Sequence, residues 1–516
     1  MSAEQVKARP GAYADSVTLM AVSAKAQAVS GVRAAMIAMA TELNLALLTE
    51  LGLTAPPGVG QHDLLVAIRA DDAESLRTAL DVVDAALAGR GATGEQSTGQ
   101  QAAPRTTSAA IARSGPGIAL ISVPGRCAFA EAMDALGRDC DVMIFSDNVP
   151  VEQEIALKEF AAERGLLVMG PDCGTAIVAG IALGFANSLR SGPIGVVAAS
   201  GTGAQQFTCL LDAAGTGCSA VLGLGGRDLS AAVGGRSART ALDALDADPA
   251  TELIVLLSKP PAGQVAAELR AYASALTKPV EFALIGPGQP DLTSAAESVL
   301  RTLGKPIPRW SRWHPRAGLE RRAGLPRRAG PALRAGPAQR AGLALRGLFS
   351  GGTLCDEAMV IAAQRLGPIY SNVPLDPAFR LDSFIHHEDR ADGRHIMIDF
   401  GADELTVGRP HPMIDQRLRL DHFAAQASDQ ATAVIMLDVV LGYGAHPDPA
   451  AEFAPAIAAA KSTRDIDVVV SLIGTQADPQ GLAAQAAALS QAGAHVFASN
   501  AQAASFACDR LLSEVR

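Results

Sequence analysis

The chain has 516 residues and a formal net charge of −10 at pH 7; 49% of its residues are hydrophobic and only 4% are aromatic. A chain of this length exceeds a single hydrophobic core, so we expect several domains. The negative charge argues against general binding to nucleic acid. Abundant alanine and glycine with few aromatic residues favour helices packed closely on parallel sheets.

The cysteines and the apolar runs indicate the compartment. Seven cysteines lie far apart, with no CxxC pair and no zinc-type spacing, which is typical of reduced thiols. The N-terminus lacks a basic start followed by an apolar core, and no run of about eighteen uncharged apolar residues follows. We therefore expect a cytoplasmic protein with no export signal, no membrane span and no nucleic-acid partner.

Residues 1–90 are predicted to form a small N-terminal α/β domain. The β-like runs SVTLMAVS, RAAMIAMAT and DLLVAIRA alternate with helical stretches, and the last helix has Asp71 or Asp72 as its expected N-cap. Residues 91–115 are polar and rich in small side chains, a composition that cannot build a core. This segment is predicted to be a linker.

Two further α/β segments follow. Residues 116–191 alternate strand and helix in GIALISV, CAFAEAMDALGRD, DVMIFSD, VEQEIALKEFAAERG and LLVMG. Residues 192–300 continue with PIGVVAASGTG, SAVLGLGG, ELIVLLSKP and PVEFALIGPG. These strands are continuous apolar runs, as expected when helices cover both faces of a parallel sheet.

The segment 301–346 has a different composition. From Arg309 to Arg346 a degenerate R-A-G repeat holds ten arginines and one acid, Glu320. One interpretation is a patch that binds anions or RNA. The other, which we adopt because proline and glycine are too frequent for a stable helix, is a low-complexity linker. Residues 347–516 then return to alternating strands and helices.

One glycine-rich turn has the form of an anion site. In AASGTGAQQF (198–207) a strand is followed by Ser-Gly-Thr and a helix, so small residues leave the N–H groups at the helix start open to an anion. Alone, this signal is weak.

A series of turns gives the chain a family resemblance. In order it reads VPGRCAFAEAMDA, SDNVPVEQ, MGPDCGTA, ASGTGAQQF and GLGGRDLSAAVGG, which resembles the α subunit of succinyl-CoA synthetase. GGTLCDEAM and DVVLGYGAHPDPA in 347–516 resemble the C-terminal domain of its β subunit. GPDCGTAI, GGRDLS and DFGADELTVGRPHPMID are similar to signatures of the FdrA family, a fused relative, and the chain is identified as a member of it.

The resemblance implies a fold. It implies a Rossmann-like domain of the CoA-binding type over 116–191 and two flavodoxin-like domains over 192–300 and 347–516. It also shows departures: where the synthetases carry a phosphorylated histidine, this chain reads ALIGPGQPDL, and Lys259 stands near the place of a supporting glutamate. No GxxxxGK[ST] loop is present, so ATP-driven ligation by this chain alone is not expected.

The resemblance also implies a phosphate position between two helix starts. Bound phosphate or carbamoyl phosphate is expected there, and CoA is a possible ligand. The residues expected to hold the phosphate or acyl group are Ser200, Gly201, Thr202, Gly203, Gly442, Gly444 and Ala445. His446 is the expected acid-base group or phosphate ligand, with Asp448 to orient it; the alternative is a loop histidine that caps the turn.

Three further groups are candidates for the substrate pocket. They are the turn Pro171, Asp172, Cys173 and Gly174; the pair Arg227 and Asp228; and the pair Arg409 and His411. Cys173 is either a thiolate nucleophile or a small residue in a turn whose backbone does the work. Arg227 either faces an anionic substrate or forms a surface ion pair.

The segment 386–411 is rich in histidine and carboxylate side chains. Its spacing matches no zinc signature such as HExxH, so no metal is expected. Arg409 and His411 are expected to hold a carboxylate substrate or a neighbouring subunit, and a solvated surface is the alternative.

These features lead to a functional hypothesis. The expected protein is a subunit of a carbamoyl- or acyl-transferring enzyme of the oxamate carbamoyltransferase type, in purine-nitrogen breakdown, acting on a small molecule with other subunits. One alternative is an acyl-CoA synthetase subunit that needs a nucleotide-binding partner. Another is a scaffold that binds CoA or a metabolite without catalysis.

Overall fold

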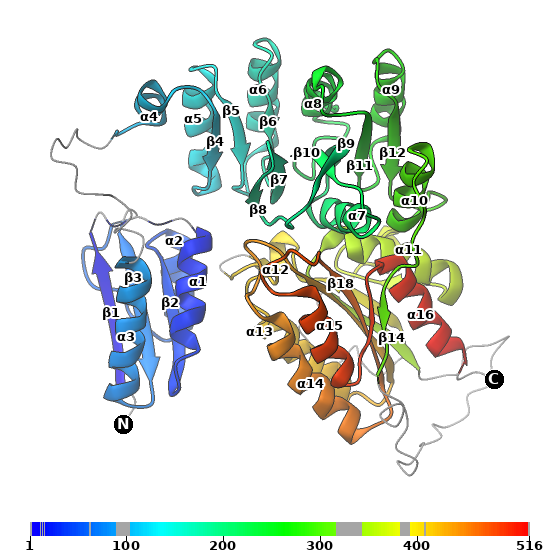
Figure 1. Cartoon of the computed structure of the whole chain (residues 1–516). Helices are drawn as coiled ribbons and strands as arrows, with labels where there is room; N and C mark the ends of the chain where they lie inside the picture. The colour runs from blue at the N-terminus through cyan, green and yellow to red at the C-terminus, as the bar shows by residue number, and fades with distance from the viewer. Residues whose placement is uncertain are drawn as a thin grey trace. The chain divides into compact units, whose positions relative to one another are not determined.

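The structure, a computed structural model, has two compact units (Figure 1). One comprises Met1–Ala110 with Asp403–Asp415, and the other Ile111–Ala402 with Gln416–Arg516. The residues described are 3–10, 12, 14, 16–60, 63–88, 104–315, 343–381, 393–406 and 409–513. Most of the arginine-rich repeat, residues 316–342, lies outside them, so both interpretations of that repeat remain predictions.

The first unit contains a three-stranded antiparallel sheet in the order β1-β3-β2. Its strands are β1 (Ala3–Arg9), β2 (Val32–Met39) and β3 (Leu64–Ala70), and its helices before residue 110 are α1 (Ser16–Gln27), α2 (Glu42–Glu50) and α3 (Ala73–Ala88). Helices α1 and α3 pack on one apolar cluster of the sheet, and α2 packs on a second. The predicted N-cap of α3 is confirmed at Asp72, whose Oδ1 accepts the N–H of Ser75 at 2.8 Å.

The prediction of a strand over SVTLMAVS is wrong, because this segment is the first part of α1. Leu19, Val22 and Ala26 are buried at helical spacing. Since β1 and β2 run parallel on either side of β3, the chain needs a crossover between them, and α1 provides it. The apolar run therefore packs as one face of a helix.

The second unit begins with a three-stranded parallel sheet in the order β4-β5-β6. The strands are β4 (Ile118–Ile121), β5 (Asp141–Ile144) and β6 (Val168–Met169). Helices α5 (Gly125–Leu136) and α6 (Val151–Ala162) pack on it and on each other, and α4 (Thr107–Ser114) precedes it. The carboxyl ends of these strands lead into the turns SVPG, SDNVP and GPDCG.

A six-stranded sheet follows, in the order β12-β11-β9-β10-β7-β8. Its parallel strands are β9 (Ser191–Ala199), β10 (Cys218–Gly223), β11 (Leu253–Ser258) and β12 (Val280–Leu284). An antiparallel hairpin, β7 (Thr175–Val178) and β8 (Ile181–Gly184), extends it through the pairing of Val221 with Ile177. The hairpin belongs by sequence to the segment 116–191, so the structure joins it to the following sheet. The helices are α7 (Gly201–Ala213), α8 (Arg236–Ala247), α9 (Gly263–Ala273) and α10 (Leu292–Thr302).

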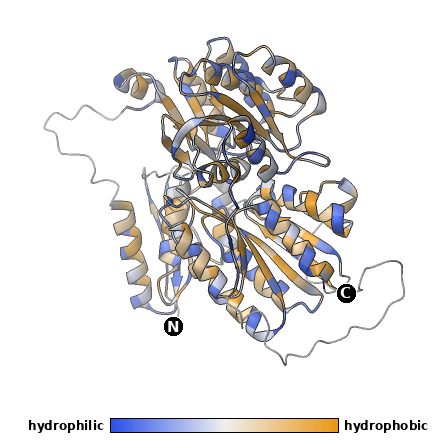
Figure 2. Cartoon of the chain, turned by 45° about the vertical axis from the view of Figure 1, so that its right-hand side comes forward, coloured by the Kyte–Doolittle hydropathy of each residue, from blue (hydrophilic) through white to orange (hydrophobic). Residues whose placement is uncertain are grey.

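The last sheet has seven strands in the order β13-β19-β18-β17-β14-β16-β15. The strands are β13 (Arg312–Trp313), β14 (Ala344–Phe349), β15 (Ile369–Tyr370), β16 (His395–Asp399), β17 (Thr432–Val440), β18 (Asp467–Ile473) and β19 (His495–Phe497). All its pairings are parallel except that of β13. Figure 2 shows these strands largely in the orange of apolar residues, as both faces are covered by helices.

The helices after residue 350 complete the chain. They are α11 (Gly352–Leu366), the 3-10 turn η2 (Pro377–Phe379), α12 (Asp403–Thr406), α13 (Arg417–Ser428), α14 (Pro449–Thr463), α15 (Leu482–Gln491) and α16 (Asn500–Ser513). None of the helices in the described ranges is long and apolar enough to cross a membrane. The predicted fold class is confirmed: several parallel-sheet α/β layers accompanied by a small N-terminal α/β domain.

Candidate functional site at two helix starts

The first helix start lies where β9 leads into α7. Ser200 is the N-cap, with extended backbone, and its Oγ accepts the N–H of Gly203 at 3.0 Å. The N–H groups of Gly201 and Thr202 have no acceptor among the described residues. Because the first N–H groups of a helix point along its axis and carry its positive end, they can bind an anion.

The second helix start, that of α11, has no side-chain cap because its N-cap is Gly351. The preceding turn is fixed instead by buried Asp438, which accepts the N–H groups of Ser350 at 2.7 Å and Gly351 at 2.9 Å. Buried Arg419 pairs with the same carboxylate at 2.8 Å. The N–H groups of Gly352 and Thr353 have no acceptor among the described residues. This turn is therefore rigid, and the helix start after it is uncapped.

The two helix starts touch each other. Ser200 Oγ and Thr353 Oγ1 are 2.6 Å apart and share a hydrogen bond. A Cβ on Gly351 would lie 2.5 to 2.7 Å from three side-chain atoms of Thr202. A Cβ on Gly203 would lie 2.9 Å from Thr353 Cγ2. Glycine is thus needed on both sides for α7 and α11 to approach this closely.

Charged side chains lie at this junction. A Cβ on Gly352 would be 2.7 Å from Nζ of Lys259, the residue after β11, and 2.6 Å from Oδ2 of Asp399, at the end of β16. The Lys259 ammonium forms no hydrogen bond with a described residue. The start of α11 therefore presents a free cation beside a carboxylate.

The pKa shifts of Lys259 and Asp399 support this arrangement. Burial alone would lower the pKa of Lys259, but three carboxylates outweigh it and raise the pKa above its ordinary value; they belong to Asp356, Asp399 and Asp172. Burial raises the pKa of Asp399 to about 6, against the lowering effect of Lys259. A carboxyl group with such a pKa exchanges protons close to neutral pH, as acid-base groups do.

The loop that holds Gly442, Gly444 and Ala445 contacts a different segment. Tyr443 donates its N–H to the carbonyl of Ala186 at 2.8 Å, and a Cβ on Gly442 would lie 2.5 Å from the same oxygen. Among the described contacts, the helix start that touches α7 is that of α11. The expected pairing of this loop with the start of α7 stays a prediction. The expectation followed from the resemblance to the synthetases.

His446 and Asp448 form a local turn. His446 Nδ1 accepts the N–H of Asp448 at 3.1 Å, and its Nε2 lies 3.5 Å from Oε1 of Glu452. Asp448 Oδ1 caps α14 by accepting the N–H of Ala451 at 3.1 Å. The carboxylate of Asp448 is therefore a helix cap, and the alternative of a turn-capping histidine fits these contacts. No contact joins this pair to the starts of α7 and α11 in the described residues.

In the turn Pro171, Asp172, Cys173 and Gly174, the surroundings of the thiol favour the alternative of a small turn residue. Cys173 is 2% exposed, and burial raises the pKa of its thiol to about 12. A Cβ on Gly223 would lie 2.5 Å from its Sγ, so the side chain fills the core. A buried, protonated thiol is a poor nucleophile. Asp172 differs, because it is exposed and its charge acts on Lys259.

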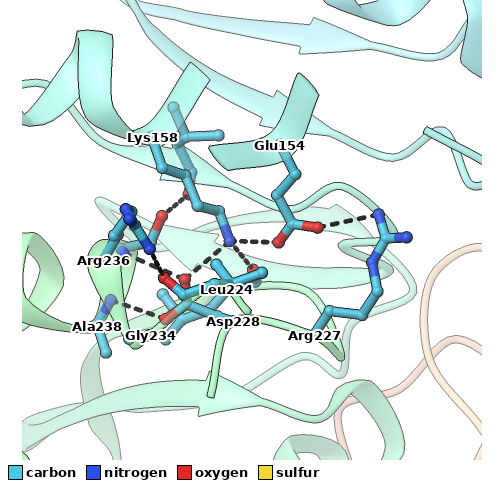
Figure 3. A network of polar contacts seen from close by, with 12 residues as sticks. Glu154, Lys158, Leu224, Arg227, Asp228, Gly234, Arg236 and Ala238 are labelled. Carbon is cyan, nitrogen blue, oxygen red and sulfur yellow. Dashed lines mark hydrogen bonds and ion pairs between the residues drawn. The ribbon is translucent and has the colours of Figure 1, made fainter. Parts of the chain in front are cut away.

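Arg227 and Asp228 belong to a buried ionic network (Figure 3). Lys158 on α6 donates to Glu154 Oε1 and to Asp228 Oδ1, both at 2.8 Å, and all three side chains are fully buried. Arg227, whose side chain is 44% exposed, pairs with Glu154 Oε2 at 2.9 Å. These contacts favour the alternative of an ion pair for Arg227 over a role in facing a substrate.

Asp228 also anchors the start of α8. Its carboxylate accepts the N–H groups of Ser237 at 3.2 Å and Ala238 at 3.0 Å. The network therefore joins α6, which covers the first sheet of the second unit, to α8, which covers the second. Its role is structural.

Arg409 and His411 lie in the segment 403–415, which groups with the first unit. His411 Nδ1 accepts the N–H of Met413 at 3.2 Å. The neighbouring His386, His387, Glu388 and Asp389 lie outside the described residues. Within the described ranges, no three His, Cys, Asp or Glu side chains are arranged to hold a metal ion.

Sequence reasoning did not connect the residues that complete the junction. GGTLCDEAM was compared with a segment of the synthetase β subunit, but its Gly351, Gly352 and Thr353 were not assigned to the phosphate position. Asp399 was considered only as part of the histidine- and carboxylate-rich segment, and Asp356 was missed. Lys259 had been noted only as a departure from the synthetases. A signal was present, because SGGT follows β14 as SGT follows β9. In addition, Lys259 directly follows a strand and Asp399 ends one, each at the carboxyl edge of a sheet.

Comparison with known proteins places the chain in a class. A CoA-ligase family model matches residues 348–509, which include α11. A model described as the AllF heavy metal-associated domain matches residues 1–104. The C-terminal part of the second unit is therefore a CoA-ligase-type domain.

The chain belongs to the same family as the uncharacterised protein YahF of Escherichia coli K12. The two are 38% identical over 496 residues, which cover 94% of each. The chain is also 30% identical over 169 residues to the α subunit of the ADP-forming succinate–CoA ligase of Methanothermobacter thermautotrophicus; these residues cover 32% of the chain and 56% of that subunit.

Among solved structures, the chain resembles a dinucleotide-forming acetyl-coenzyme A synthetase of Ca. Korarchaeum cryptofilum in complex with phosphate and ADP. That likeness has a TM-score of 0.30 and 16% sequence identity, and it covers 82% of this chain and 88% of the other.

The residues of the N-terminal unit do not fit a heavy metal. Residues 1–104 contain no cysteine and a single histidine, His62, which lies outside the described residues. Soft metal ions select thiolate ligands, and their sites are built from Cys or from clustered His side chains. The metal in the name of the matching family is therefore not assigned to this chain.

Proposed function

We propose that this chain is a subunit of an enzyme related to acyl-CoA synthetases, and that it binds the phosphate or acyl-phosphate part of its substrate between the starts of α7 and α11. The observation that carries the proposal is the direct contact of two helix starts with open N–H groups, beside the ammonium of Lys259. N–H groups at helix ends and a nearby cation stabilise a phosphate or a developing oxyanion.

The family comparisons support the acyl-CoA side of the proposal. The CoA-ligase match covers the part of the chain that contains α11, and one relative of the chain is named as a succinate–CoA ligase α subunit. CoA is accordingly the first thiol to test as acyl acceptor. The cytoplasm, where CoA and nucleotides are abundant, is the proposed location.

A second subunit is part of the proposal. Residues 283–292, where the synthetases carry their phosphorylated histidine, contain none, and no P-loop motif is present. The nucleotide chemistry is therefore assigned to a partner subunit in a hetero-oligomer. This chain would receive an activated acyl group and complete its transfer.

A second candidate is FdrA-type carbamoyl transfer, such as between oxamate and carbamoyl phosphate in purine-nitrogen breakdown. The same observation favours it, because a site with Lys259 and without a phosphohistidine suits phosphorolysis, which needs bound phosphate and no ATP. The FdrA-like motifs GPDCGTAI, GGRDLS and DFGADELTVGRPHPMID support it further.

One set of assays separates the two candidates. The full chain, alone and co-purified with proteins expressed from neighbouring genes, is assayed for CoA thioester formation with ATP and for phosphate-dependent carbamoyl transfer. The proposal expects thioester formation only with a partner. Carbamoyl transfer without thioester formation would select the second candidate, and activity of neither kind would refute both.

A variant pair ties either activity to the site. Lys259→Gln removes the ammonium at the junction and is expected to lower activity strongly. Lys305→Gln removes an exposed ammonium after α10 and is expected to leave activity unchanged. Equal activities of the two variants would contradict the placement of the site.

A further inference from the structure

Asp399 lies where a ligand at the start of α11 would meet it. It is 5% exposed, and its Oδ1 accepts the N–H of Gly401 at 2.9 Å. Its other oxygen, Oδ2, accepts no hydrogen bond from a described residue and points to the place that a Cβ on Gly352 would occupy, 2.6 Å away. A largely buried carboxylate with one oxygen that lacks a donor is costly when charged, so its charge depends on a nearby cation or a proton.

Among the described charged groups near Asp399, one cation is available to compensate its negative charge. The titratable and charged groups that face it from the neighbouring elements are Lys259 after β11, Cys355 and Asp356 on α11, Asp438 on β17 and Arg419 on α13. Arg419 is already paired with Asp438 at 2.8 Å. Burial raises the pKa of the Cys355 thiol well above its ordinary value, so that group is neutral. Lys259 is thus the cation that compensates both Asp399 and Asp356.

An anion at the helix starts would compete for the same cation. Lys259 Nζ and Asp399 Oδ2 both lie within 2.7 Å of one point at Gly352. An anion drawn by the N–H groups of α7 and α11 would bring a further negative charge to Lys259, and the charge on Asp399 would then be repelled. Protonation of Asp399 removes the repulsion and gives the anion a hydrogen-bond donor.

We propose that Asp399 takes up a proton when an anion binds between the starts of α7 and α11, while Lys259 exchanges Asp399 for the anion as its partner. The inference rests on the proposed function, because it concerns the same site. It adds that the substrate is bound together with a proton and that a neutral carboxyl group then stands beside its phosphate oxygens. Such a group is a proton donor in the position where a general acid works.

The ordinary state of Asp399 fits this coupling. With a pKa of about 6 the unliganded group is mostly ionised at neutral pH, yet a further rise of about one to two units would protonate it. The affinity for a dianion should therefore increase as the pH falls toward 6. Protonation of the ligand itself would have the opposite effect, because it would lower the affinity as the pH falls.

Sulfate is the appropriate probe, because it keeps its double negative charge near neutral pH and takes up no proton itself. Isothermal titration of the full chain with sulfate at neutral pH, in two buffers of different ionisation enthalpy, gives the number of protons bound. The expected result is an uptake approaching one proton per sulfate. In Asp399→Asn the uptake should vanish while sulfate still binds, and Asp465→Asn, at an exposed site, should behave as the parent does.

Each other outcome overturns a distinct statement. Sulfate binding without proton uptake by the parent overturns this inference and leaves the proposed function intact. Uptake that persists in Asp399→Asn and disappears in Asp356→Asn overturns the assignment to Asp399. Absence of sulfate binding, in a protein whose circular dichroism shows it to be folded, overturns both. Lys259→Gln checks the exchange of partners, since it should weaken sulfate binding about tenfold or more.

Discussion

Ser200 and Thr353 lie 153 positions apart in the chain, and their hydroxyls share a hydrogen bond of 2.6 Å. Ser200 follows a strand of the six-stranded sheet, and Thr353 follows a strand of the seven-stranded sheet. The bond therefore fixes two helix starts from different sheets against each other. Their free N–H groups and Lys259 converge at one place as a result.

Replacing Thr353 by valine tests this contact. The change removes one hydroxyl at nearly constant shape, and Ser200 still caps α7. We expect a loss of about 1 kcal/mol in the free energy of unfolding and weaker sulfate binding, because the helix starts lose their alignment. Thr208→Val is the matched control, since its hydroxyl bonds to Ala204 O at 2.7 Å within α7. Equal sulfate affinities in both variants would show that the contact does not shape the site.

Gly352→Ala should block the junction directly. The added methyl would lie 2.6 Å from Asp399 Oδ2 and 2.7 Å from Lys259 Nζ, so it takes the space of a bound anion. We expect sulfate affinity to fall about tenfold or more, which corresponds to about 1.4 kcal/mol. Gly263→Ala adds the same methyl at the start of α9, where nothing lies within 4 Å. Titration calorimetry on both variants measures the difference, and an unimpaired Gly352→Ala would refute the location of the site.

Lys158→Met should destabilise the second unit. It leaves the buried carboxylates of Glu154 and Asp228 without their cation, and breaking such a buried pair costs about 3 to 5 kcal/mol. Arg227→Gln removes a half-exposed partner of the same network and should cost about 1 kcal/mol or less. Urea unfolding of the two variants gives the comparison. Sulfate affinity should stay unchanged in Arg227→Gln, and a large decrease would restore Arg227 to the binding site.

Thiol labelling should detect one reactive cysteine. Cys127 is exposed and the other six cysteines are buried. Burial raises the pKa of Cys173 and of Cys218 to about 12, so neither forms a thiolate at ordinary pH. We expect one equivalent to react with Ellman's reagent in the folded protein and none rapidly in Cys127→Ser. Rapid labelling of Cys173, located by mass spectrometry, would revive its role as a nucleophile.

Stability should fall as the pH rises through the range of buried Glu357. Burial raises its pKa from 4.5 to about 7. Between these values the folded state holds a proton that the unfolded chain has lost, so the penalty appears as the pH rises through this window and is relieved as it falls. Glu357→Gln should thus gain stability relative to the parent at about pH 8 compared with about pH 5.

Urea midpoints across this range measure the effect of Glu357. Asp399, with a pKa of about 6, contributes in the same direction, so the slope should shrink in the variant and not vanish. The exposed Glu163→Gln should leave the slope as it is. An identical slope in parent and Glu357→Gln would contradict the prediction.

Much of the fold follows from local patterns. The continuous apolar runs of the parallel strands, such as ELIVLLS and DVVVSLI, predicted buried strands because both faces of these sheets are covered. The apolar runs gave wrong or missing predictions where packing with the rest of the chain decides the secondary structure. SVTLMAVS has apolar content suited to either structure and is a helix because a crossover is needed there, and the hairpin β7–β8 was missed because each of its strands has only four residues.

One of the two helix starts that form the site was predicted from the sequence. The start of α7 was identified because a strand, small residues and a helix stand next to one another. The start of α11 was compared with a segment of the synthetases, but it was not paired with α7, because which strand ends face each other depends on the packing of two sheets. Lys259 and Asp399 are 140 positions apart and meet only through that packing. A motif order along the chain carries no such information.

The bond between Ser200 and Thr353 has a consequence for how the junction responds to dilution. Two helix starts on separate proteins would part once the concentration fell below their dissociation constant. On one polypeptide the second start remains at a fixed effective concentration near the first. The anion affinity of the junction should therefore be the same in nanomolar as in micromolar solutions of the protein.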